Sequence, residues 1–150
     1  MTASGLQSIV EPPCWEIAAP DLTRLIAELS AFGDRGSVLC LEGIIAAEIE
    51  TFLRARPSSI ENRTGRGFLK TRPKMFFMPI TPESTQGLAR LSETYAEPEV
   101  CDHLRVYENN RLILSWHDVP FDPVYVASEV AEPRVGGFSA TLGCRYLFVP

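Results

Sequence analysis

The sequence has no long apolar run, because none of its hydrophobic stretches approaches the ~18 residues that a helix needs to cross a bilayer. Lysine is scarce, with only Lys70 and Lys74 among 14 basic residues. The four cysteines are too sparse for a disulfide framework, and the first 20 residues lack the basic and apolar regions of a secretory signal. We therefore expect a cytoplasmic protein with reduced thiols that is neither membrane-bound, fibrous nor disordered.

The composition is that of one ordinary soluble domain. The 150 residues are 45% hydrophobic and 22% charged, and the formal net charge is −5. Residues 1–20 hold three prolines and two acidic side chains, which predicts an extended N-terminal arm. Residues 21–150 are predicted to form a single domain.

Apolar periodicity predicts both helices and strands in this domain. After Asp21 the apolar positions follow the i, i+3, i+4, i+7 spacing of a helix, and similar patterns with capping residues mark three others. The predicted helices cover 21–32, 44–56, 82–95 and 133–142. Strands are predicted at 37–41, 74–78, 103–107, 112–116 and 145–149, while 124–130 fits a strand or a helix. We expect an α+β fold in which a mixed, mainly antiparallel sheet of four to five strands is packed on one side by about four helices.

A tight turn at Asn109 and Asn110 predicts a hairpin, because two asparagines in tandem tolerate the positive φ of such a turn. If its register holds throughout, Asp102 lies opposite His117, an arrangement that can orient an imidazole as a general base. No activated nucleophile accompanies the pair, so a structural role is favoured. His117 and Asp118 would point to opposite faces if the strand continued through them.

The other face of this hairpin carries residue types that are enriched at binding hot spots. A protein partner, including a second copy of the chain in a homodimer, would fit such a surface. The alternative is that the tryptophan belongs to the core. The candidate binding residues on this face are His103, Arg105, Tyr107 and Trp116.

Charge is distributed unevenly along the chain. Residues 54–74 carry a local charge of +6, so the remaining residues sum to −11. Guanidinium groups and glycine-flanked backbone N–H groups in this segment could wrap a small anion, although a solvated loop that balances acidic helices is the alternative. A sequence pI of 5.1 argues against nucleic acid. The candidate anion ligands are Arg63, Arg66, Lys70 and Arg72.

No motif identifies a cofactor or a metal. The sequence has no C-x-x-C doublet, P-loop or dinucleotide-binding glycine pattern, and Cys101 with His103 offers only two ligands on one strand face. We therefore predict no metal site and no cofactor. The leading interpretation is a non-catalytic interaction or regulatory module that binds a protein partner or a small anionic ligand. The alternative is a small enzyme of unknown reaction that uses Asp102 and His117 near the basic segment.

Overall fold

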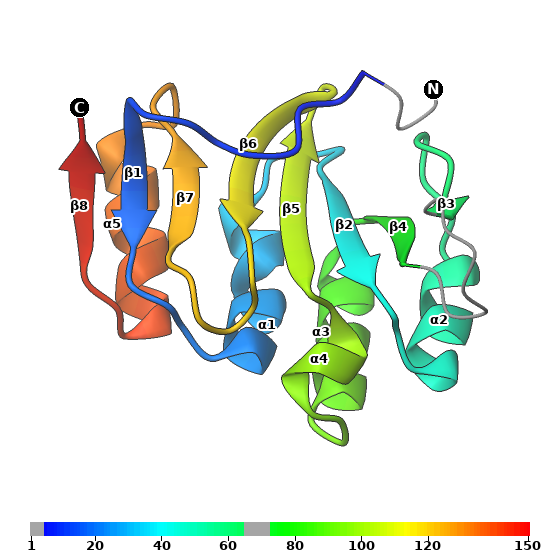
Figure 1. The fold of residues 1–150 in the computed structure, drawn as a ribbon. Helices are drawn as coiled ribbons and strands as arrows, with labels where there is room; N and C mark the ends of the chain where they lie inside the picture. Colours follow the sequence, from blue (N-terminus) through cyan, green and yellow to red (C-terminus); the bar gives the residue numbers. More distant parts are fainter. Residues whose placement is uncertain (1–4, 65–72) are drawn as a thin grey trace.

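One antiparallel sheet organises the molecule (Figure 1) in the computed structural model, which describes residues 5–64 and 73–150. Its strand order is β3-β4-β2-β5-β6-β7-β1-β8. The strands are β1 (Cys14–Ile17), β2 (Val38–Gly43), β3 (Arg63–Thr64), β4 (Lys74–Pro79), β5 (His103–Glu108), β6 (Arg111–Trp116), β7 (Val124–Ala127) and β8 (Tyr146–Val149). The helices are α1 (Leu22–Phe32), α2 (Ala47–Arg54), α3 (Pro82–Ser92), α4 (Glu97–Val100) and α5 (Glu132–Leu142).

The predicted α+β fold is confirmed, but the predicted sheet is too small. The described residues form eight strands rather than four to five, and every pairing between them is antiparallel rather than mixed. The added strands β1 and β3, like helix α4, have only two to four residues and show no repeated period. Strand β1 falls inside the expected N-terminal arm, yet it pairs on both sides, with β7 and β8.

Capping residues set three helix ends as expected, whereas α2 and α3 are shorter than the predicted 44–56 and 82–95. The Asp21 side chain accepts a hydrogen bond from the backbone N–H of Arg24 at 2.9 Å, which begins α1. Thr81 caps α3 with Pro82 in its first turn, and Gly143 ends α5 with a φ of 68°. No helix in the described part of the chain is long and apolar enough to cross a membrane.

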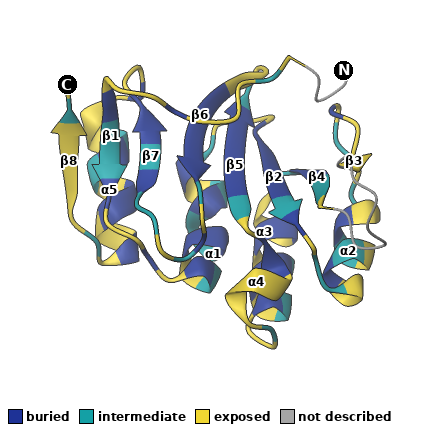
Figure 2. Ribbon diagram, in the orientation of Figure 1, coloured by how far each residue is buried: buried dark blue, intermediate teal, exposed yellow. Residues whose placement is uncertain are grey.

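The helices cover one face of the sheet, here called the helix face, and bury the main core against it (Figures 1 and 2). The opposite face, here called the front face, is crossed by the segment that precedes β1, which passes over β6 and β5. Three hydrogen bonds attach it: Tyr107 Oη to Gln7 O (2.6 Å), Arg105 Nε to Ser8 O (2.6 Å), and Val10 N to Ser115 Oγ (3.0 Å). A second, smaller apolar cluster is buried on this face.

All four cysteines are described and none forms a disulfide. Cys14, Cys40 and Cys101 are buried, whereas Cys144 is half-buried. Burial raises the pKa of the Cys40 thiol to about 12 and also raises the pKa of the Cys101 thiol. These thiols are small core residues.

Candidate metal centre

The tight turn between β5 and β6 forms as predicted. Asn109 and Asn110 have φ values of 50° and 63°, the positive values that a two-residue hairpin turn requires. Next to the turn, Tyr107 pairs with Leu112, which confirms the expected register at this end of the hairpin.

A bulge then changes the register. Val106 pairs with Leu114 and Leu104 with Trp116, so one residue of β6, Ile113, is inserted between the two registers. With the insertion, Ile113 and Leu114 both reach the main core. Every pair beyond the bulge is displaced by one residue from the prediction.

This displacement brings two histidines together at the open end of the hairpin, the end away from the turn. The rings of His103 and His117 stack with their centroids 3.8 Å apart and an angle of 9° between their planes. Asp102 lies beside Gly43, and its backbone N–H donates to Glu42 O at 2.8 Å. The prediction that Asp102 opposes His117 is therefore wrong, because His103 occupies that position.

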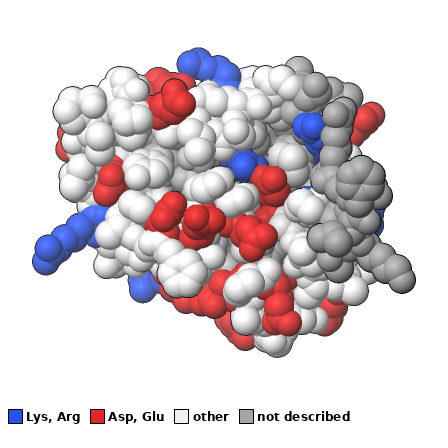
Figure 3. All heavy atoms as spheres, in the orientation of Figure 1, with Lys and Arg blue, Asp and Glu red and all other residues white. Residues whose placement is uncertain are grey.

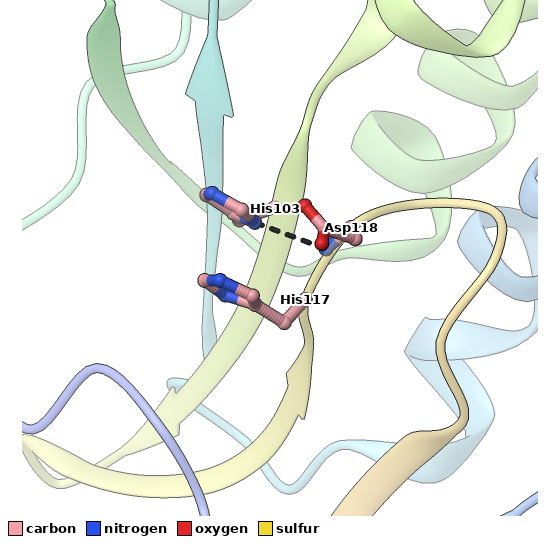
Figure 4. A group of neighbouring side chains, drawn as sticks. All are labelled: His103, His117 and Asp118. Atoms are coloured by element: carbon pink, nitrogen blue, oxygen red, sulfur yellow. Dashed lines mark hydrogen bonds between the residues drawn. The ribbon is translucent and has the colours of Figure 1, made fainter.

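Asp118 completes a three-residue cluster with the two histidines (Figure 4). Strand β6 ends at Trp116, and Asp118 turns back with a φ of 46°, so that its backbone N–H donates to Nδ1 of His103 at 3.2 Å. One ligand atom from each of the three side chains lies within 4.8 Å of the other two. His117 and Asp118 would face opposite ways only if the strand continued through them, and that condition is not met because β6 ends at Trp116.

The surroundings of the cluster lower the pKa of His103 and supply negative charge. Burial first, and then the neighbouring His117, lowers the pKa of His103, with Arg105 acting in the same direction and Glu42 and Asp118 against it. Glu42 is the cross-strand neighbour of His103 on β2. Acidic side chains gather over the lower half of the front face (Figure 3). A neutral imidazole presents a lone pair to a metal, and an acidic surface attracts cations.

The lowered pKa of His103 predicts that the metal-free protein loses stability in acid. The unfolded chain has a histidine pKa of about 6.5, so below that pH it binds more protons than the folded state. Stability contributed by neutral His103 is thus present above the unfolded pKa and is lost as the pH falls toward the lower folded value. Urea unfolding with a chelator present should show a larger loss between neutral and mildly acidic pH for wild type than for His103→Asn. Identical pH profiles would contradict this assignment.

The donor set of the cluster is one that transition metals use. Two imidazoles and one carboxylate bind zinc in catalytic sites and non-haem iron in oxygenases, and both kinds of site leave coordination positions open. Carboxylate oxygens alone would favour magnesium or calcium, whereas two imidazoles favour zinc, iron, cobalt or nickel.

The predicted aromatic patch does not form one exposed surface. Trp116 is 0% exposed and lies in the main core on the helix face, since the bulge turns it away from the front face. Arg105 and Tyr107 are on the front face but are buried at the contacts with the N-terminal segment. Of the four residues, only His103 is partly accessible.

Most of the predicted anion ligands lie outside the described residues, namely Arg66, Lys70 and Arg72. Arg63 is exposed in β3. Other basic groups of this segment pair with acidic side chains: Arg56 with Glu83 at 2.7 Å, and Lys74 with Glu50 at 3.0 Å. These pairs agree with charge balance at the ends of the segment, and anion binding by its centre stays a prediction.

Sequence reasoning missed Asp118 as a site residue. A usable signal was present, because β6 was predicted to end at residue 116 and Pro120 disfavours further strand pairing. Because His117 and Asp118 follow that boundary, their side chains need not point to opposite faces as neighbouring residues of a strand do.

The comparisons with known proteins add nothing to this geometry. No family model, no curated protein and no solved structure matches the chain. The interpretation of the site therefore depends on its own residues.

Proposed function

We propose that this protein is a binding module that holds a divalent transition-metal ion with His103, His117 and Asp118. The observation that supports it is the convergence of three ligand atoms, two of them imidazole nitrogens, within 4.8 Å of one another. In this proposal the open coordination positions of the metal bind a small anionic ligand.

To close on a metal, the two imidazole rings must tilt out of their stacked arrangement, in which the centroids are 3.8 Å apart and the planes 9° from parallel, so that both nitrogen lone pairs point at one ion. Zinc–nitrogen and zinc–oxygen bonds of about 2.0–2.2 Å place tetrahedral ligand atoms about 3.3 Å apart. Metal ligation at Nδ1 of His103 would replace its 3.2 Å hydrogen bond from the Asp118 backbone, and such a bond contributes about 1 kcal/mol. Structural zinc sites in zinc-finger peptides release about 10 kcal/mol or more, which is far larger than the loss of one such bond.

The charge of the loaded site favours an anion as the further ligand. Two neutral imidazoles and one carboxylate leave a dication with a net charge of +1. That charge and the open positions suit a carboxylate or phosphate oxygen. This retains the small anionic ligand predicted from the sequence but assigns its recognition to the metal instead of the basic segment.

Metal titration tests the proposal. The chelator-treated protein should bind one Zn²⁺ by calorimetry, and Co²⁺ should give the visible absorption bands of a four- or five-coordinate site. Asp118→Asn and His117→Ala should each weaken Zn²⁺ binding by more than about 100-fold, the upper end for changes to groups that merely support a ligand.

Asp102→Asn is the matched control, because Asp102 is an exposed aspartate next to His103 in sequence and is not part of the cluster. It should bind Zn²⁺ as tightly as wild type. Absence of Zn²⁺ binding by wild type, or equal affinity in Asp118→Asn, overturns the proposal. A loss of Zn²⁺ binding confined to Asp102→Asn would overturn it as well, because Asp102 lies outside the cluster.

A further inference from the structure

The sheet ends in an unshielded edge at β8 (Tyr146–Val149), which among the described residues pairs only with β1. All four residues of β8 are apolar, and Tyr146, Leu147 and Phe148 are 37%, 55% and 46% exposed (Figure 2). Six large hydrophobic side chains are exposed on the described residues, and these are three of them. Exposed apolar surface is thus concentrated on one edge of the sheet.

Soluble monomers protect edge strands with charged residues, prolines, bulges or a covering segment. Between Tyr146 and Val149 there is no charge and no proline, and the pairing with β1 runs without a bulge. Trp15 of β1 makes edge contacts with Tyr146 (6.0 Å between centroids) and Phe148 (4.9 Å), which fixes both rings. The strand is therefore an ordered template for another strand.

The other edge of the sheet does not match β8. Strand β3 has two residues, Arg63 and Thr64, and both are exposed and polar. Pairing of β8 with β3 of the next molecule would also build an open-ended array, whereas pairing of β8 with itself closes as a dimer. The strand that complements β8 best on this chain is β8 of a second copy.

We infer that two copies associate through antiparallel pairing of their β8 strands, which joins the two sheets into one across a two-fold axis. In an antiparallel pair, directly opposed residues place their side chains on the same face of the sheet, whereas neighbouring residues within one strand face opposite ways. The two-fold axis must therefore pass between two copies of the same residue. Leu147 opposite Leu147, or Phe148 opposite Phe148, satisfies this condition. Both registers bring apolar side chains together without like charges among residues 146–149.

Sedimentation velocity between ~1 μM and ~1 mM protein tests the inference. Wild type should sediment as a dimer within this range, and Leu147→Lys should be monomeric. The substitution brings two ammonium groups together when Leu147 opposes itself, and it places each ammonium group against Val149 of the other copy when Phe148 opposes itself. The Leu147 side chain is 55% exposed and lies on the face opposite Trp15, so circular dichroism should show an unchanged fold. Ile44→Lys is the matched control, with 54% exposure at the end of β2, and it should dimerise like wild type.

Amide hydrogen exchange identifies the surface involved. Protection of the β8 amides should rise with protein concentration in wild type and not in Leu147→Lys. A wild-type protein that stays monomeric at ~1 mM, as it would if β8 were reserved for a different protein, overturns the inference. Dimerisation of Leu147→Lys with wild-type affinity overturns it as well.

Discussion

Replacement of Trp116 by alanine is expected to lower the free energy of unfolding by about 3–5 kcal/mol, the range for truncating a large buried aromatic residue. Trp116 is 0% exposed within the main core, and its Nε1–H donates to Asp122 O at 2.7 Å. The substitution therefore opens a cavity and removes a hydrogen bond that holds the loop after β6. Urea unfolding followed by circular dichroism measures the loss.

Trp15, the second tryptophan of the chain, is the matched control. It is half-buried, and its Nε1–H donates to Val130 O at 3.1 Å. Trp15→Ala should therefore destabilise the protein by less than Trp116→Ala. In a Trp15→Phe background the remaining Trp116 fluorescence should resist quenching by acrylamide. Ready quenching, together with a loss below about 1 kcal/mol in Trp116→Ala, would place Trp116 on the surface, as the binding-patch alternative of the sequence analysis has it.

Local patterns predicted the parts of the fold that depend on local physics. Helix α1 begins at its Asp21 cap, α3 at Thr81, and the hairpin turn forms at Asn109 and Asn110, because capping and turn geometry involve residues close together in sequence. Strand β3 has only two residues, and Glu16 interrupts the apolar residues of β1, so neither shows a recognisable period, whereas the four-residue β8 is apolar throughout and was predicted. Strand β1 is held by pairing with two distant strands, and that information lies outside its own four residues.

The bulge could not be located from the sequence. Residues 112–114 read Leu-Ile-Leu, so an insertion anywhere in this run leaves the apolar pattern unchanged. A one-residue displacement exchanges the faces of all that follows, which is why the opposition of Asp102 and His117 failed. The same displacement produces the His103–His117 pair, so the candidate site and the error have one cause.

Replacement of Arg105 by methionine is expected to cost about 1.5–3 kcal/mol, the range for hydrogen bonds to charged groups. The loss stays below that for breaking a fully buried ion pair because the Glu42 side chain is 26% exposed. Arg105 is 4% exposed, and its guanidinium donates to Glu42 Oε2 and to Ser8 O, both at 2.6 Å. The variant leaves the Glu42 carboxylate without its cation and detaches one anchor of the N-terminal segment. Urea unfolding should show the loss, and amide exchange at Val10, which donates to Ser115, should accelerate.

A double variant separates the ion pair from simple loss of packing. Replacing both partners of a buried pair by apolar residues is often close to neutral, whereas removing one leaves a charge uncompensated. Arg105→Met combined with Glu42→Leu should therefore recover a large part of the stability that Arg105→Met loses. Equal losses in the single and double variants would show that Glu42 is well solvated without Arg105. In that case the anchor to Ser8, and not the ion pair, would account for the contribution of Arg105 to the front face.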